Sequence, residues 1–254
     1  PARPDQAPDR THLPGPGVEI MAFLTRYADD PSTPSARSAI RDVLVRAAAP
    51  AVALWAVIVG LGFLITGPLG GLSAENSLSE SVQGSRTDTW NSVTMVWSRI
   101  GNTEIIIGVC VLAVGLLWWR TRQWWLAVVP AIAISLQATV FVIATAVVGR
   151  SRPEVAHLDP APPTSSYPSG HMGAATALYV SFALLAQRIE RPMLRRLVTT
   201  VLLVVPLLVG WARLYRGMHH LSDIVVGAAN GLVCALLAWA YLRRRQSSVT
   251  GGSR

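Results

Sequence analysis

Charged residues are scarce in this chain of 254 residues, and lysine is absent altogether. Only 14% of the residues are charged, whereas 51% are hydrophobic. An average soluble domain is nearer to a quarter charged, so this composition argues against a soluble globular protein. Cysteine is also rare. Cys110 and Cys234 both lie within apolar runs and have no metal-ligand spacing, so they indicate neither a metal site nor a redox compartment.

All 22 cationic residues are arginine, and together with 14 acidic residues they give a net charge of +8. A basic chain suggests nucleic-acid binding, but most of these arginines form short clusters between long apolar runs. That distribution is typical of membrane proteins, whose topology follows the placement of positive charge. We therefore expect an integral membrane protein whose partner is the bilayer and not nucleic acid.

Six apolar segments predict an all-α, polytopic membrane protein with six transmembrane helices. They cover residues 44–64, 105–119, 124–148, 172–186, 197–211 and 224–242. A spanning helix needs about 20 apolar residues. The second, fourth and fifth segments are shorter than that, so each must extend into flanking residues or lie among other helices.

Two polar tails are expected to flank a membrane domain at residues 37–245. Residues 1–36 are rich in Pro, Asp, Arg and Ser, and they lack both a helical apolar period and a signal-peptide pattern. They predict a disordered cytoplasmic tail, in which Met21 is a candidate translation start. Residues 246–254 predict a similar short tail.

Arginine placement predicts that both termini are cytoplasmic and that the outer loops face away from the cytoplasm at the inner (plasma) membrane. The first outer loop carries only Arg86 and Arg99, beside four acidic residues. The predicted cytoplasmic segments carry Arg37, Arg41, Arg46, Arg120, Arg122, Arg188, Arg191, Arg195, Arg196, Arg243, Arg244 and Arg245.

The first outer loop is also expected to contain an interfacial helix. Trp90, Val93, Trp97 and Ile100 are spaced as one helical face, and polar residues fill the other face. Such a helix covers the bundle or guides a lipid.

Two polar stretches, from Thr145 to His171 and from Arg213 to Asp223, are predicted at the same outer edge of the membrane. Ionisable groups at membrane depth are costly, which makes them functional candidates. Arg152 and Arg213 offer guanidinium donors suited to phosphate oxygens. Residues 169–171 begin the fourth helix, where free backbone N–H groups can meet an anion.

Two histidines complete this set of groups. His219 and Asp223 are four residues apart, which predicts one helix face on which the carboxylate orients the imidazole. His171 is available as a proton donor for a leaving group. Arginines, a helix start, an oriented histidine and a proton donor together indicate phosphoryl transfer.

These stretches resemble the type-2 phosphatidic acid phosphatase (lipid phosphate phosphatase) superfamily. Its motifs are Lys-x6-Arg-Pro, Pro-Ser-Gly-His and Ser-Arg-x5-His-x3-Asp. They appear here as Thr145-x6-Arg152-Pro153, Pro168-Ser169-Gly170-His171 and Ala212-Arg213-x5-His219-x3-Asp223.

The resemblance implies a metal-independent and cofactor-free hydrolase that acts on a lipid phosphate. His219 would be the nucleophile that forms a phosphohistidine, Asp223 its orienting partner, and His171 the acid and then the base. The phosphoryl oxygens would be held by Arg152, Arg213, Ser169 and Gly170. The family's substrates suggest polyprenyl diphosphate, phosphatidic acid or phosphatidylglycerophosphate.

Two positions depart from the motifs, because Thr145 replaces lysine and Ala212 replaces serine. Arg150 and Arg216 are candidates to compensate for the missing cation, or simply anchors at the lipid headgroups. A catalytically silent relative that binds lipid phosphates and a lipid phosphotransferase therefore stay open as alternatives. A lipid transporter is a further alternative, but the sequence has no clear internal repeat.

Three further histidine-containing features have simpler interpretations. His157, with Glu154 and Asp159, is interpreted as a solvated face of the proline-rich loop. His220 is interpreted as a packing neighbour or substrate contact. Half a metal site at His219 and Asp223 is disfavoured because no further ligands have suitable spacing. The oligomeric state has no sequence signal.

Overall fold

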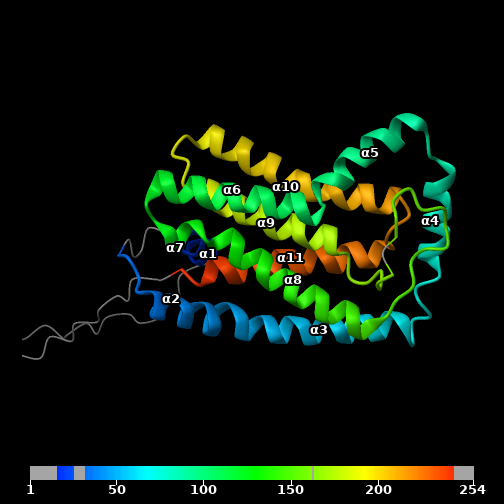
Figure 1. The fold of residues 1–254 in the computed structure, drawn as a ribbon, viewed down its shortest axis with the longest axis horizontal. Coiled ribbons are helices and arrows are strands. Elements are labelled where there is room, and N and C mark those ends of the chain that lie inside the picture. The colour runs from blue at the N-terminus through cyan, green and yellow to red at the C-terminus, as the bar shows by residue number, and fades with distance from the viewer. Residues whose placement is uncertain (1–15, 26–31, 162, 243–254) are drawn as a thin grey trace, which may run out of the picture.

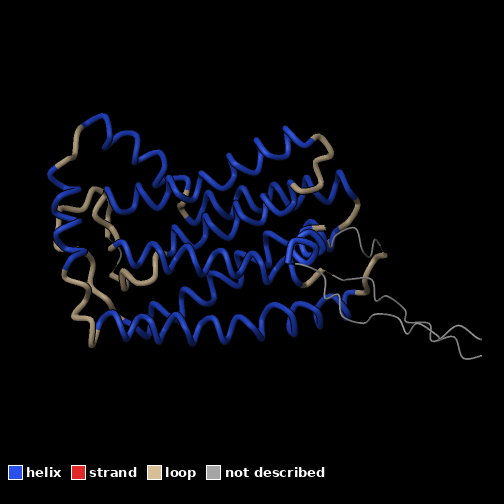
Figure 2. The backbone as a smooth tube through the Cα atoms, turned by 180° about the vertical axis from the view of Figure 1, so that it is seen from behind, coloured by secondary structure: helices blue, strands red, loops and turns tan. Residues whose placement is uncertain are grey.

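The computed structural model describes residues 16–25, 32–161 and 163–242. Within these ranges every regular element is a helix and there is no strand, which confirms the predicted all-α class. The long helices lie side by side in a bundle, and one short helix crosses an end of it (Figure 1 and Figure 2).

Five segments are long and apolar enough to cross a membrane. They are Ala36–Thr66, α6 (Thr103–Thr121), Trp124–Val148, α10 (Pro192–Tyr215) and α11 (Leu221–Ala240). The first comprises α2 (Ala36–Val43), a π-helical turn η2 (Leu44–Ala48) and α3 (Ala49–Thr66), and the third comprises α7 (Trp124–Ala127) and α8 (Val129–Val148). A shorter apolar helix, α9, covers Gly170–Ala186. The predicted apolar segments thus all form helices, and the chain is a polytopic membrane protein.

The short helix α9 lies in the centre of the bundle. It packs against α6, α8, α10 and α11, and most of its residues are buried, on every face. A helix surrounded by protein need not match the bilayer thickness by itself. The expectation that a short segment lies among other helices is confirmed here, whereas α6 and α10 gain length from flanking residues.

The segment between α3 and α6 forms two helices, α4 (Ala74–Gly84) and α5 (Asp88–Ile100), one more than predicted. α4 stands across the end of the bundle (Figure 1). In α5 the buried side chains are Thr94 and Ser98, while Trp90 and Val93 are exposed. The polar face of α5 therefore covers the bundle, while its apolar face is exposed at Trp90 and Val93 and half-buried at Trp97 and at Ile100, which packs against the core.

The prediction of a disordered tail over residues 1–36 is wrong at Pro16–Leu24, which form helix α1. α1 lies at the end of the bundle opposite α4 (Figure 1). The backbone carbonyl of Phe23 accepts a hydrogen bond of 2.9 Å from the indole of Trp239, and Phe23 and Leu24 pack against the core there. This contact ties the segment to α11. The predicted tail at 246–254 lies outside the described residues.

Candidate active site

The two polar stretches meet in a cavity of about 890 Å³ at the α4 end of the bundle. Its charged wall contains Arg152, Gly170, His171, Arg213, Arg216 and His219. Its remaining wall comes from the α5–α6 junction, from one side of α8 and from loop residues 158–160 and 164–165. The predicted convergence of sequence-distant groups therefore occurs for these six residues.

Gly149 directs the first stretch into the site. It ends α8 with φ +65°, in the left-handed region that favours glycine. The chain therefore leaves the helix immediately before Arg150 and Arg152. The following loop returns to Ser169, the N-cap of α9, whose backbone N–H donates to the carbonyl of Asp223.

His219 is buried, and its ring is held by a backbone carbonyl. Nδ1 lies 2.7 Å from the carbonyl oxygen of Ser166. A carbonyl only accepts hydrogen bonds, so Nδ1 carries the proton and Nε2 keeps its lone pair. Burial and the positive charge of Arg213 lower the pKa of His219 well below its ordinary value. The imidazole is therefore neutral at neutral pH and has an unprotonated nitrogen.

The predicted arrangement of His219 and Asp223 on one helix face is wrong. α11 begins at Leu221, so His219 lies in the preceding turn. The Asp223 oxygen nearest to His219 Nδ1 is 3.9 Å away, beyond hydrogen-bond distance. Asp223 is thus an electrostatic neighbour of the ring, and the Ser166 carbonyl is its hydrogen-bond partner.

Asp223 instead caps the helix that carries it. Its carboxylate accepts from the backbone N–H of His220 at 2.9 Å and lies 3.3 Å from the His220 ring. The same carboxylate pairs with Arg150 at 2.6 Å. His220, predicted as a packing neighbour or a substrate contact, is therefore the N-cap of α11.

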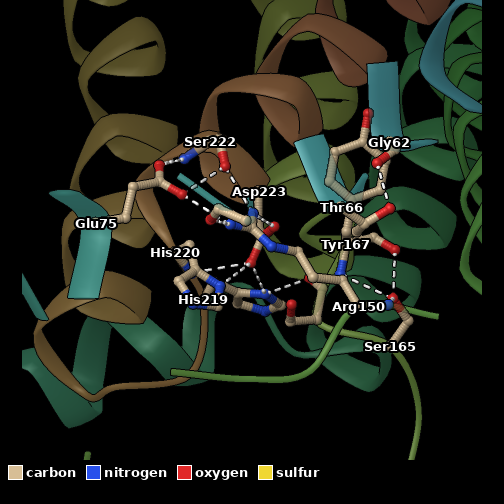
Figure 3. Close-up of polar contacts among 12 residues, drawn as sticks. Gly62, Thr66, Glu75, Arg150, Ser165, Tyr167, His219, His220, Ser222 and Asp223 are labelled. Atoms are coloured by element: carbon tan, nitrogen blue, oxygen red, sulfur yellow. Dashed lines mark hydrogen bonds and ion pairs between the residues drawn. The ribbon is translucent and has the colours of Figure 1, made fainter. Parts of the chain in front are cut away.

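Arg150 reaches into a polar cluster with Glu75, Ser222 and Asp223 (Figure 3). Its guanidinium donates to Asp223, to Ser222, to the Gly71 carbonyl and to Glu75. Glu75, from α4, also accepts from the backbone N–H and the hydroxyl of Ser222. Arg150 thus links α4 to the start of α11 and is not among the cavity-lining residues.

Among the described residues, Arg152 and Arg213 each have a guanidinium N–H group without a hydrogen-bond partner. Arg152 donates from Nη1 to the Met218 carbonyl, and its buried Nε has no hydrogen-bond partner there. Arg213 donates from Nη1, and its Nε is also buried without a partner. Burial lowers the pKa of Arg152 because it disfavours the charged guanidinium, and an anion beside the side chain would offset that cost.

His171 lies in the first turn of α9 and faces the α5–α6 junction. Its Nε2 is 3.0 Å from the Asn102 side-chain oxygen. Because an amide oxygen only accepts hydrogen bonds, His171 donates from Nε2 to Asn102. Asn102 was missed by the sequence analysis because it lies 69 residues away in the chain and belongs to no motif.

Of the other residues predicted to contact the phosphate, one lines the cavity and two lie behind its wall. Gly170 lines the cavity, but Ser169 is fully buried and its hydroxyl oxygen accepts from the Met172 backbone N–H at 3.5 Å. Thr145 donates to the Tyr167 carbonyl at 3.3 Å and is not among the lining residues. The structure therefore brings Gly170 into the cavity and leaves Ser169 and Thr145 behind its wall.

Asp159 is a site residue that the sequence analysis placed elsewhere. The interpretation of Asp159 as part of a solvated loop face is wrong, because its side chain is 22% exposed and pairs with Arg213 and Arg216. Burial by itself would raise the pKa of Asp159. Hydrogen bonding by Arg216 and the charge of Arg213 outweigh that effect and hold this pKa below its ordinary value.

The fold and the site together define a multi-pass membrane protein. Its cavity is lined by histidines and arginines, the residue types that can bind a phosphate group. Residues 124–247, which contain all three motifs, match the PAP2 superfamily, and the family resemblance noted in the sequence is confirmed. This part of the membrane protein therefore belongs to the PAP2 superfamily.

Two solved structures share this fold. One is the first transmembrane PAP2-type phosphatidylglycerolphosphate phosphatase from Bacillus subtilis, at 22% identity and a TM-score of 0.65, covering 74% of this chain and 93% of that one. The other is LpxE from Aquifex aeolicus, at 19% identity and a TM-score of 0.52, covering 64% of this chain and 92% of that one. No curated protein matches the chain.

Proposed function

We propose that this protein hydrolyses the phosphate or diphosphate head of a membrane lipid through a phosphohistidine on His219, without a metal. The observation that carries the proposal is the state of the buried His219 ring. Its Nδ1 proton is held by the Ser166 carbonyl, and its Nε2 keeps a lone pair in a cavity that it shares with Arg152, Arg213 and His171.

In the first half-reaction, Nε2 of His219 attacks phosphorus as the bond to the lipid oxygen breaks. His171 gives that oxygen a proton, and the negative charge of the bound phosphate favours the protonated form of His171 beforehand. In the second half-reaction, His171 removes a proton from water, which attacks phosphorus and breaks the N–P bond. Arg152 and Arg213 stabilise the charge on the phosphoryl oxygens, a role that metal ions fill in other phosphatases.

The composition of the cavity supports a lipid substrate. Beyond the charged wall it is lined by apolar side chains of α6, α8 and α9, including Ile106, Ile134, Phe141 and Ala174. A polar end joined to an apolar end suits an amphiphile. By the arginine rule we place this end of the bundle at the outer leaflet, with both termini cytoplasmic.

A phosphate-release assay in detergent, with EDTA present, tests this function. Polyprenyl diphosphate, phosphatidic acid and phosphatidylglycerophosphate are the substrates to compare. We expect release from at least one lipid, inhibition by vanadate, loss of release in His219→Ala, and an acid-labile labelled phosphoprotein in a rapid quench. Strong inhibition by EDTA would contradict the histidine mechanism.

The first alternative, suggested by Thr145 in place of the motif lysine, is a catalytically silent relative. It predicts that the protein binds lipid phosphates but releases no phosphate from any of them. A phosphotransferase would release less phosphate and form a phosphorylated acceptor when candidate alcohols are added. Product analysis in the same assay distinguishes both from a hydrolase.

A further inference from the structure

The carboxylate of Asp159 lies inside the cavity and engages two of its arginines. Oδ2 accepts from Arg213 Nη1 at 2.9 Å and from the Ser98 hydroxyl at 3.0 Å. Oδ1 accepts from Arg216 Nε at 2.8 Å and forms an ion pair with Arg216 Nη2 at 2.7 Å. Both carboxylate oxygens are thus bound by the kind of donor that a phosphate oxygen would use.

The arginines themselves are held firmly, so the carboxylate is the movable member of this cluster. Arg216 donates to the carbonyls of Leu158 and Asn91, and Arg213 to the Ser98 hydroxyl. The Leu158 backbone N–H also donates to the Arg216 carbonyl at 3.1 Å. The loop backbone beside Asp159 is therefore fixed, so releasing Arg213 requires a rotation of the Asp159 side chain, which also disturbs its contacts with Ser98 and Arg216.

The charges in the cavity make the two anions compete. Arg99, Arg152, Arg213 and Arg216 are positive, and Asp159 is the acidic residue among those that line the same cavity. A phosphate dianion that takes the donors of Arg213 would meet the Asp159 carboxylate at short range. Like charges at such distances in a buried site repel strongly, so phosphate and the carboxylate compete for Arg213.

We propose that Asp159 is an internal competitor of phosphate, which engages Nη1 of Arg213 and must release it when the phosphate of a substrate takes that donor. This inference rests on the proposed function, because it assumes that the phosphate enters at Arg213. Its consequence is selectivity for lipids over free phosphate. A free phosphate displaces the carboxylate with its charge alone, whereas a lipid also gains the burial of its chain in the apolar part of the cavity.

The competition predicts that removing the carboxylate charge tightens the binding of small anions. We expect Asp159→Asn to lower the inhibition constant of inorganic phosphate and of vanadate about tenfold, the equivalent of about 1.4 kcal/mol. The matched control is Glu154→Gln in the same loop, since Glu154 is exposed and does not line this cavity. It should leave the inhibition constants and the turnover unchanged. A purely structural role for Asp159 predicts the opposite sign, because misplaced arginines would bind phosphate more weakly.

Ser98→Ala provides a second variant if Asp159→Asn does not fold. It removes the hydrogen bond from Ser98 to the carboxylate and the one from Arg213 to Ser98, so it weakens Asp159 and leaves Arg213 one more free donor for phosphate. It should lower the phosphate inhibition constant by about threefold. Constants that are unchanged or higher in the folded variants would overturn the inference.

Calorimetric titration of the purified protein with phosphate and with vanadate, without any lipid, separates this inference from the proposed function. Tighter binding in Asp159→Asn by a protein that hydrolyses no lipid would support the competitor and refute the phosphatase. Unchanged anion binding in an active phosphatase would refute the competitor alone.

Discussion

At the residue scale, the contact between His219 and the Ser166 carbonyl changes what is expected of the motif aspartate. In a serine-protease triad, replacing the carboxylate by an amide costs about 10⁴ in turnover because the histidine tautomer is wrong. Here the carbonyl holds the Nδ1 proton at 2.7 Å, and the nearest Asp223 oxygen is 3.9 Å away. The tautomer therefore does not depend on Asp223.

We expect Asp223→Asn to reduce kcat by about 10- to 100-fold, because only electrostatic support of the charged imidazole is lost. The measurement is steady-state phosphate release in detergent, with thermal unfolding as a check on the loss of the Arg150 pair. A loss near 10⁴ in a protein of unchanged stability would show that Asp223 orients the ring after all.

The depressed pKa of His219 has a consequence for stability. The unfolded chain protonates this histidine below about pH 6.5, while burial and Arg213 keep the folded form neutral to a much lower pH. The unfolded state therefore binds more protons, and the stability falls as the pH decreases below 6.5, by up to about 1.4 kcal/mol per pH unit. Above pH 6.5 this effect is absent.

Comparing the wild-type protein with His219→Gln in denaturant unfolding between pH 5 and pH 7.5 tests this effect. The wild-type free energy of unfolding should decrease more steeply towards pH 5 than that of the variant, and the two slopes should agree above pH 6.5. Parallel curves over the whole range would mean that the folded His219 titrates normally.

At the scale of elements, α9 and α11 approach each other closely enough to exclude a side chain. A Cβ atom on Gly227 of α11 would lie 2.5 Å from the Ser169 carbonyl oxygen, which is backbone and cannot rotate away. Because Ser169 is the N-cap of α9, this contact determines where the helix start that carries Gly170 and His171 lies.

Gly227→Ala should therefore lower the stability by about 1–3 kcal/mol and also reduce phosphate release. Gly115→Ala in α6 is the matched control, since nothing lies within 4 Å of its added Cβ. It should be neutral or slightly stabilising, because alanine is the better helix former. Thermal unfolding and activity are measured for both variants. Equal stability of the two would show that the helices separate without cost.

The sequence was sufficient to predict the elements whose signal is local. An apolar run marks a membrane helix wherever it packs, which is why all six segments were found. α4 was missed because its apolar content is low, and α1 because its segment is short. Contacts such as the one between Phe23 and Trp239 stabilise α1. Similarly, motif spacing predicted His171, Arg152, Arg213 and His219. Ser166, Asn102 and the position of Asp159 depend on where distant loops meet, which no local pattern encodes.

At the scale of the whole molecule, the bundle has two chemically different ends. The motif loops and α4 lie at one end, and α1 with the arginine-rich turn between α9 and α10 lies at the other (Figure 1). Positive charge concentrates on the cytoplasmic side of membrane proteins. We therefore expect Arg188, Arg191, Arg195 and Arg196 to lie in the cytoplasm and the cavity to face outward.

Labelling of single cysteines in intact cells tests this orientation. The two native cysteines are buried and can be replaced by alanine, after which Glu80→Cys in α4 and Glu190→Cys in the α9–α10 turn each provide one exposed thiol. A membrane-impermeant maleimide should label Glu80→Cys directly and Glu190→Cys only after permeabilisation. The reverse pattern would place the cavity at the inner leaflet, where the enzyme would meet newly made lipid phosphates instead of those already translocated. The orientation thus determines which pool of lipid the proposed phosphatase can reach.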